Sequence, residues 1–413
     1  MNIRKIERNF MRVLTGQGIS SMANGILRFA MSLFILDQTG SAAIFANILA
    51  LSLIPTIILS PIGGIIADRF NRKKIMVVLD LITAIIVILL SIFLPIGNKI
   101  IVLGITMILL SVLNSFETPT VQASIPILVE NSSNTLEQAN AAISQINALA
   151  NLFGPILGGM LYGFWGITPI IYICIFSFIL AAIIECFIYM PDMDEMVSND
   201  FFKTMKNDFC SSLVFLKKNK LILKTLIIIS LFNMSISSML VIGLPYIVKI
   251  TLGMSSQLYG LTEGAMGAGT ILGGVILGLF SKKPRKIRTE YFLLLTCISI
   301  IPIGVSILNL SYPFISYLVI TGCVVVCMTL STIFSLLILV FIQRNTPNNL
   351  LGKISSFVVV ISMCSQPIGQ AFYGYLFDVS GSNLYIIIFI TILLGVVLGV
   401  LSKNVFRDEK YKN

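Results

Sequence analysis

Four ionisable side chains interrupt long apolar segments of this 413-residue chain: Arg28, Asp80, Glu117 and Glu263. A charge inside such a segment is costly and is retained mainly for function. A carboxyl group in this setting can exchange a proton as its surroundings change, which is the chemistry of proton coupling. The chain contains no histidine, so one of the carboxyl groups would have to be the side-chain proton carrier.

Glu117 meets more of the conditions for proton coupling than the other carboxyl groups. It lies deep in its apolar segment, and Pro119 close by leaves a backbone carbonyl without its helical partner. Arg28 is its expected counter-charge. A fixed Arg28–Glu117 ion pair with a purely architectural role is the alternative, and Glu263 is the second candidate for coupling.

Two further carboxyl groups are assigned structural roles from their positions along the chain. Asp80 lies less than two helical turns after a basic run and is expected to serve structure near Arg72 or Lys73. Glu185 lies near the end of its apolar segment and is expected to extend to the membrane surface.

The composition defines the elements that carry these residues. Hydrophobic residues make up 56% of the chain and charged residues only 11%, which excludes an ordinary soluble enzyme and a disordered protein. Twelve apolar stretches are each long enough to cross the hydrocarbon core as a helix. The sequence therefore predicts an all-α membrane protein with 12 transmembrane helices.

The basic residues predict the orientation of these helices. Of the 28 Lys and Arg residues, 25 lie on one side of the predicted topology, and only Lys99 and Lys249 lie on the other. This asymmetry places both termini in the cytoplasm. The net charge of +10 is then a topology signal with contact to anionic lipid, and nucleic-acid binding is excluded.

Neither a metal nor a bound cofactor is expected. The seven cysteines are dispersed singly without a Cys-x-x-Cys pair, and no ATP-binding glycine loop occurs. The sequence predicts no catalytic residues, and the protein is not expected to be an enzyme.

Several short motifs recur at an offset of about half the chain length. The Gly64–Lys74 run has a counterpart at Gly278–Lys286, and Pro155 has one at Pro367. We expect two pseudo-symmetric six-helix halves, with a binding cavity at their interface. The predicted boundaries are residues 1–190 and 221–413, joined by a cytoplasmic linker over 191–220. Amphipathic spacing favours an interfacial helix over 201–218, and a flexible connector is the alternative.

These motifs resemble a known family. The Gly64, Asp68-Arg69 and Arg72-Lys73-Lys74 pattern resembles the loop signature of the major facilitator superfamily. The Gly154-Pro155-x-x-Gly158-Gly159 run resembles the motif of its antiporters, and Asp80 with the short linker resembles the macrolide-efflux-type drug:proton antiporters. Asn71 replaces the usual glycine, and the arginine typical of helix 4 in other drug antiporters is absent.

The resemblance implies a monomer in the cell membrane that exports a small amphipathic or hydrophobic compound in exchange for protons by alternating access. A lysophospholipid or siderophore-type carrier and a non-transporting membrane sensor are the alternatives. A conformational latch is expected from Gly64, Asp68, Arg69, Arg72 and Glu130. Gly64 is expected to permit close approach of the second and eleventh apolar stretches, at about residues 42–66 and 354–376. The substrate cavity is expected to be lined by Gln17, Asn24, Phe116, Asn233, Tyr246, Thr329 and Phe334.

Overall fold

The first half of the chain forms six helices in the computed structural model, which describes residues 3–129, 133–190, 216, 218–280, 289–308, 311–347, 350–381 and 383–407. These helices are α1 (Ile3–Thr39), α2 (Ala42–Arg69), α3 (Arg72–Phe93), α4 (Lys99–Leu128), α5 (Ser133–Trp165) and α6 (Ile167–Cys186). Glu130 and nearly all of the predicted 201–218 helix lie outside the described residues.

The second half begins with one long helix that changes its hydrogen-bonding pattern twice. It runs as α8 (Lys220–Phe232), the π-helical segment η1 (Asn233–Ser237), α9 (Ser238–Pro245) and a second π-helical segment η2 (Tyr246–Thr251). Five further helices follow: α10 (Ser256–Phe280), α11 (Thr289–Leu308), α12 (Pro313–Arg344), α13 (Leu351–Ser380) and α14 (Leu384–Arg407).

The predicted fold class is confirmed. Twelve long helices and no strand occur in the described part of the chain, counting Lys220–Thr251 as one helix. Eleven of the twelve, all except α13, are long and apolar enough to cross a membrane. Helices are the expected solution because each one satisfies its backbone hydrogen bonds internally.

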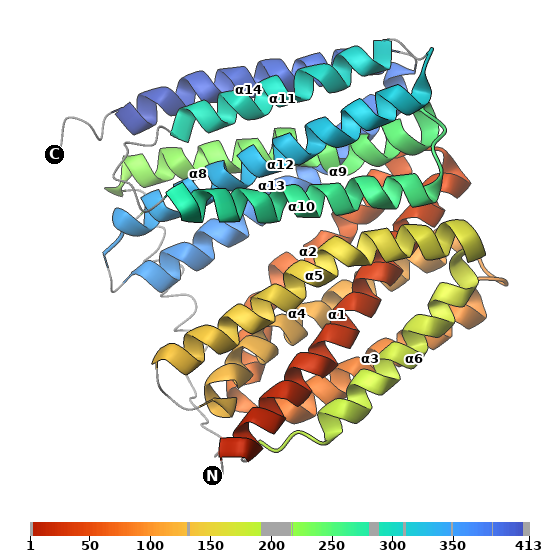
Figure 1. The fold of residues 1–413 in the computed structure, drawn as a ribbon, viewed down its shortest axis with the longest axis vertical. Coiled ribbons are helices and arrows are strands. Elements are labelled where there is room, and N and C mark those ends of the chain that lie inside the picture. The colour runs from red at the N-terminus through yellow and green to blue at the C-terminus, as the bar shows by residue number, and fades with distance from the viewer. Residues whose placement is uncertain are drawn as a thin grey trace. The chain divides into compact units, whose positions relative to one another are not determined.

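The chain divides into two compact units that exchange short segments. Unit 1 consists of residues 1–39, 51–197 and 255–264, and unit 2 of residues 40–50, 198–254 and 265–413. Within unit 1, α1 packs against α4, α5 and α6, and α3 packs against α4 and α6. Within unit 2, α11 packs against α12 and α14, and α13 packs against the α8–α9 helix (Figure 1).

The start of α2 is held by an acidic side chain from α13. Asp378 accepts hydrogen bonds from the backbone N–H of Ala42 at 2.6 Å and from the hydroxyl of Ser41 at 2.5 Å. A carboxylate in this position satisfies an unpaired N–H and complements the helix dipole. Both segments belong to unit 2, so this contact ties residues 40–50 into that unit.

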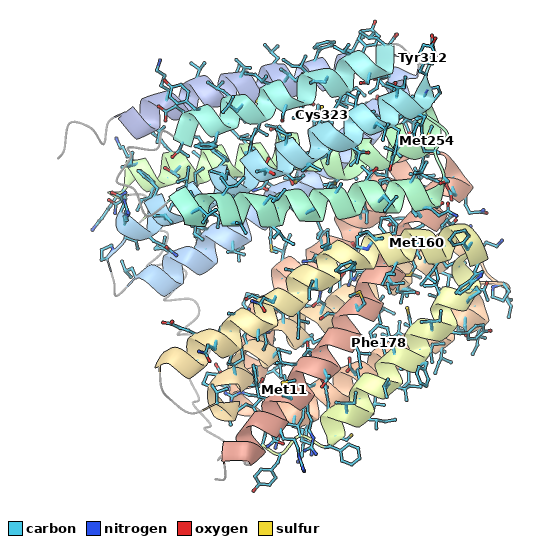
Figure 2. The ribbon with its side chains drawn as sticks, viewed as in Figure 1. Met11, Met160, Phe178, Met254, Tyr312 and Cys323 are labelled. Carbon is cyan, nitrogen blue, oxygen red and sulfur yellow. The ribbon has the colours of Figure 1, made fainter. Side chains whose placement is uncertain are left out.

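Aromatic residues at the ends of helices lie in two environments. Trp165 is 61% exposed, and Tyr312 at the start of α12 is 66% exposed (Figure 2), as expected for side chains that anchor in a membrane interface. Tyr317, one turn into α12, is instead buried in unit 2 at 4% exposure.

Gly63 is a point of close approach between α2 and α4. A Cβ atom placed on Gly63 would lie 3.0 Å from Cα of Phe116 and would collide with the backbone oxygen of Ser115. A Cβ on Gly64 would meet no heavy atom within 4 Å. The contact of α2 with α4 therefore forms at Gly63, and the approach of α2 to α13 expected at Gly64, which would join different units, stays a prediction.

We expect Gly63→Ala to destabilise the protein by about 1–3 kcal/mol, because α2 and α4 would have to separate to admit the methyl group. The measurement is thermal unfolding of the purified protein in detergent. Gly64→Ala is the matched control, and it should unfold at the wild-type temperature or slightly above, since alanine favours the helix. Equal unfolding temperatures for the two variants would contradict the assignment.

Candidate functional site

A stripe of polar side chains runs along α1. Gln17, Ser20, Asn24 and Arg28 recur at intervals of three or four residues, which places them on one face of the helix. Gln17 and Ser20 are buried, and Asn24 and Arg28 are partly buried. Because unbonded polar groups are costly inside a membrane protein, this face requires polar partners from the neighbouring helices.

Two buried carboxyl groups supply these partners. Ser20 Oγ donates to Asp80 Oδ1 of α3 at 2.7 Å, and Gln17 Nε2 donates to Glu185 Oε1 of α6 at 3.2 Å. Asp80 is 2% exposed and Glu185 is fully buried. Gly16 leaves the space for Glu185, since a Cβ there would lie 2.9 Å from Glu185 Cγ. Carboxyl groups from two helices are thus held against α1.

Glu117 of α4 is the third carboxyl group in this region. It interacts with Gln17, Ser20 and Arg28, and it is partly rather than fully buried. Asp80 interacts electrostatically with both Glu117 and Glu185. We refer to Asp80, Glu117 and Glu185 as the acidic cluster, which lies entirely in unit 1.

Arg28 is the cation that faces this cluster. Its Nε donates to Asn24 Oδ1 at 2.7 Å, and its Nη1 donates to Ser111 Oγ at 3.0 Å. Arg28 and Glu117 interact electrostatically, but they form no ion pair within 4.0 Å in the described part of the chain. The fixed Arg28–Glu117 ion pair that the sequence left open is therefore not formed.

Three buried atoms of this site lack hydrogen-bond partners among the described residues: Arg28 Nη2, Asp80 Oδ2 and Glu185 Oε2. Such atoms are rare in folded proteins and point to an exchangeable proton, a water or a ligand group. Each of the two fully buried carboxyl groups therefore has one bonded oxygen and one oxygen that is open to such a group.

The partner expected for Asp80 and the surface position expected for Glu185 are wrong. Asp80 bonds to Ser20 of α1 and not to the basic run that begins at Arg72. Glu185 is fully buried and does not extend to the membrane surface. The polar spacing along α1 was the signal that could have indicated both contacts.

Glu263, the second predicted coupling residue, lies apart from the acidic cluster in its bonding. It accepts a hydrogen bond from the hydroxyl of Tyr259, one turn earlier on α10. The ring of Tyr259 stacks on Phe29 of α1 with centroids 5.3 Å apart. The side chain that bonds Glu263 is thus itself packed against α1 in unit 1.

The predicted latch residues form a compact turn between α2 and α3. Arg72 is buried, pairs with Asp68 at 3.5 Å and donates from Nε to the carbonyl oxygen of Ala67 at 2.9 Å. Asn71 caps α3 by accepting from the N–H of Lys74. Arg69 is partly buried, and the proposed partner Glu130 lies outside the described residues.

The glycine motif of α5 brings backbones together on two sides. A Cβ at Gly154 would lie 3.2 Å from Cα of Gly25, and one at Gly158 would lie 3.1 Å from the Ile26 oxygen, both on α1. A Cβ at Gly159 would lie 2.8 Å from Cα of Gly260 on α10. Pro155 belongs to the second contact, because a Cβ at Gly260 would lie 2.7 Å from its carbonyl oxygen.

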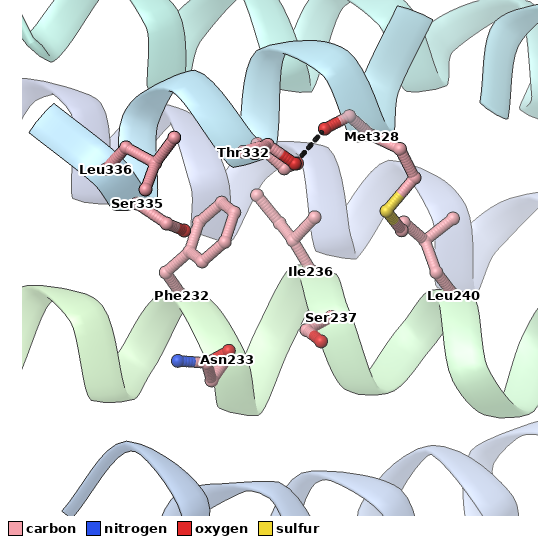
Figure 3. A pocket seen from close by; sticks show the side chains of 10 residues that line it. Phe232, Asn233, Ile236, Ser237, Leu240, Met328, Thr332, Ser335 and Leu336 are labelled. Carbon is pink, nitrogen blue, oxygen red and sulfur yellow. Dashed lines mark hydrogen bonds between the residues drawn. The ribbon is translucent and has the colours of Figure 1, made fainter. Parts of the chain in front are cut away.

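Unit 2 contains a pocket of about 250 Å³ between the α8–α9 helix and α12 (Figure 3). Ten uncharged residues line it: Phe232, Asn233, Ile236, Ser237, Leu240, Met328, Ser331, Thr332, Ser335 and Leu336. Only Asn233 was among the predicted cavity residues. The close spacing of Ser331, Thr332 and Ser335 was the available signal for the polar wall.

The other predicted cavity residues lie in different surroundings. Gln17 and Asn24 belong to the polar stripe of α1, and Phe116 lies at the α2–α4 contact beside Gly63. In unit 2, three residues pack against neighbouring helices. Thr329 donates to the oxygen of Gly269 at 3.1 Å, Phe334 is fully buried against Phe232, and Tyr246 packs on Phe377.

Comparison with known proteins assigns this geometry to a family. Residues 13–369 match the description "Major Facilitator Superfamily". Macrolide efflux protein A of Streptococcus pyogenes is 24% identical over 402 residues, which cover 94% of each chain, and its Enterococcus faecalis namesake is 27% identical over 65% of this chain and 80% of its own.

Solved structures show the same fold. A bacterial homologue of the iron transporter ferroportin in an inward-facing state has a TM-score of 0.73 at 15% identity and covers 98% of this chain and 99% of its own. A D-xylose–proton symporter has a TM-score of 0.70 at 13% identity, with 95% and 96% covered. At these identities the likeness concerns the fold alone.

We expect Gln17→Leu to destabilise the protein by about 1–3 kcal/mol, because it leaves the buried Glu185 carboxyl without its donor. Gln17→Leu combined with Glu185→Leu should cost less than the sum of the two single changes, since both polar partners are then absent. Thermal unfolding in detergent provides the measurement. Additive losses would show that the two side chains do not depend on each other.

Proposed function

Because this chain belongs to the Major Facilitator Superfamily, we propose that it is a proton-coupled secondary transporter that exports a small amphipathic or hydrophobic compound by alternating access. The observation that carries the proposal is the acidic cluster. Three carboxyl groups lie around one face of α1, with Arg28 as the facing cation. In a low-dielectric interior, gain or loss of one proton changes the electrostatic energy of such a group strongly.

The direction of transport and the substrate class are supported by the relatives. Proteins named for macrolide efflux match this chain over almost its full length. Macrolides are amphipathic small molecules, and a protein that exports such compounds is a transporter rather than an enzyme. The protein would act as a monomer with small-molecule substrate, protons and membrane lipids as its partners.

Within the cluster, Glu117 is the carboxyl group that exchanges its proton with solvent. Asp80 and Glu185 are at most 2% exposed, whereas Glu117 is only partly buried. Gln17 and Ser20 interact with Glu117 and bond the two buried carboxyl groups. A change in the charge of Glu117 would therefore alter the interactions of Gln17 and Ser20 on α1, and through them the hydrogen bonds to Asp80 on α3 and Glu185 on α6.

We expect Glu117→Gln to abolish proton-driven accumulation of substrate while retaining downhill exchange, because glutamine resembles the protonated carboxyl in size and hydrogen bonding. Accumulation of radiolabelled erythromycin A in inverted proteoliposomes, with and without an imposed pH gradient, should fall at least about tenfold toward the no-gradient level. Glu137→Gln, which changes an exposed carboxyl on α5, should behave as wild type.

Three outcomes separate the alternatives for coupling. Loss of coupling in Glu263→Gln with full coupling in Glu117→Gln would place the proton at Glu263. Full coupling in both variants would contradict a role for either carboxyl. Absence of pH-driven movement by the wild-type protein across a panel that includes erythromycin A and a lysophospholipid would contradict the proposed transport function.

The orientation of the proposed exporter follows from its basic residues. We expect both termini to face the cytoplasm of the cell, because 25 of the 28 basic residues fall on the same side as the termini in the topology predicted from the sequence. Single cysteines added to either end of a cysteine-free variant should react with a membrane-impermeant maleimide only after the cells are opened. Labelling of either end in intact cells would reverse the topology.

A further inference from the structure

The pocket in unit 2 owes its shape to the π-helical segment η1. The side chains of Phe232, Ile236 and Leu240 extend from this helix toward α12 (Figure 3). A spacing of four residues exceeds the 3.6 residues of an α-helical turn, so in a regular helix such a row gradually winds away from its neighbour. The wider π turn offsets this drift and keeps the three side chains on one wall.

The wide turn is stabilised by a specific contact. The backbone N–H of Ser238 bonds to the Asn233 carbonyl five residues earlier, which is the π-helical pattern. The hydroxyl of Ser238 also donates to the Asn233 oxygen at 2.9 Å, and it lies 3.3 Å from the Gln366 oxygen of α13. The π turn is thus held in place by the helix packed behind it, and π-helical turns occur frequently at functional sites.

The facing wall of the pocket carries hydroxyl groups. The Thr332 hydroxyl donates to the Met328 oxygen at 2.8 Å, so its lone pairs are left to accept a hydrogen bond. The buried Ser331 hydroxyl has no hydrogen-bond partner among the described residues, and its neighbour is the weakly bonding thiol of Cys327. On the opposite helix, Asn233 uses its Nδ2 to bond the Ile229 oxygen, which leaves its amide oxygen as an acceptor.

The chemistry of the walls restricts what can bind. None of the ten lining residues is charged, so an ionic group would enter without a counter-charge, at high cost. One wall is formed by Phe232, Ile236 and Leu240, and the other offers hydroxyl groups. A ring with an apolar face and hydroxyl groups at its edge would suit both walls, with Thr332 and Ser335 as the hydroxyl partners.

The size of the pocket sets a further limit. A volume of about 250 Å³ lies below the range of roughly 300–1,000 Å³ that is usual for pockets enclosing drug-sized ligands. The pocket can therefore hold one ring of a larger compound but not the whole molecule. A charged part of the same compound would have to bind elsewhere.

We propose that this pocket binds an uncharged, hydroxyl-bearing ring of the exported compound, such as a neutral deoxysugar. This inference rests on the proposed export function and adds the substrate class to it. The proton-binding carboxyl groups and the ring-binding pocket then lie on different helices. The carboxyl groups belong to α3, α4 and α6, and the pocket is formed by the α8–α9 helix and α12.

The test measures binding to the purified full-length protein in detergent, with two radiolabelled compounds. Erythromycin A carries one uncharged and one cationic sugar, and its derivative without the uncharged sugar retains the cationic one. We expect Thr332→Val to weaken binding of erythromycin A about five- to tenfold and binding of the derivative less than about twofold, because valine keeps the shape but removes the hydroxyl. Ser335→Ala should act in the same direction.

Thr270→Val is the matched control. Thr270 of α10 also donates its hydroxyl to the oxygen four residues earlier, at 3.0 Å, but it is exposed and lies outside the pocket. This variant should bind both compounds as the wild type does. A loss in this control equal to that in Thr332→Val would show that the effect comes from the helix and would overturn the pocket assignment.

The remaining outcomes are also decisive. Equal weakening of both compounds by Thr332→Val, no weakening of either by Thr332→Val and Ser335→Ala, or no binding of erythromycin A to the wild type would overturn the inference. Sugar-dependent binding without pH-driven transport would support the pocket and contradict the proposed function. The two proposals can therefore fail separately.

Discussion

A carboxyl group buried between helices needs a hydrogen-bond partner, and this requirement fixes the rotation of α1 in unit 1. Ser20 and Gln17 can bond Asp80 and Glu185 only if their common face is turned toward α3 and α6. The apolar residues of α1 then take the remaining directions, with Leu27, Ala30 and Met31 fully buried. Between helices in a membrane, apolar surface discriminates weakly because lipid is equally apolar. The polar bonds therefore supply much of the orientation.

Glycine contacts set the distances between these helices. Gly25 of α1 faces Gly154 of α5, Gly159 of α5 faces Gly260 of α10, and Gly63 of α2 lies on the backbone of α4. Close backbone approach replaces the hydrophobic driving force that soluble helix bundles use. A contact without interlocking side chains also offers little resistance to sliding, which would suit the helix movements of the proposed alternating access. The same motif thus serves packing and the proposed motion.

The two units differ in the chemistry that they bury. Unit 1 contains the acidic cluster and Arg28, whereas the pocket of unit 2 is lined only by uncharged side chains. In the proposed exporter this difference separates proton exchange from recognition of the uncharged part of the substrate. A proton site built from other helices than the substrate pocket places no titrating group among the uncharged residues that line the pocket. The coupling would then pass through movement of helices.

The amino-acid sequence alone specified the twelve helices and the all-α class, because the thickness of the hydrocarbon core dictates the length and composition of each span. It also indicated the α5 glycine motif and the charged positions Glu117 and Arg28, since small residues in a span permit close helix contacts and charged residues interrupt an apolar span visibly.

Tertiary packing decides which helices meet. Spacing along one helix reveals which residues share a face, but it does not reveal which neighbouring helix that face contacts. Asp80 and Glu185, which come from helices far apart in the chain, were therefore joined to the site only by tertiary packing. Gly63 rather than Gly64 contacts α4, and the two positions differ by a rotation of about 100° around the helix axis. The spacing of residues in the sequence does not show which of the two faces the neighbouring helix. The π turn at Asn233–Ser237 also packs against a distant helix, since Gly369 of α13 lies on its backbone at Met234.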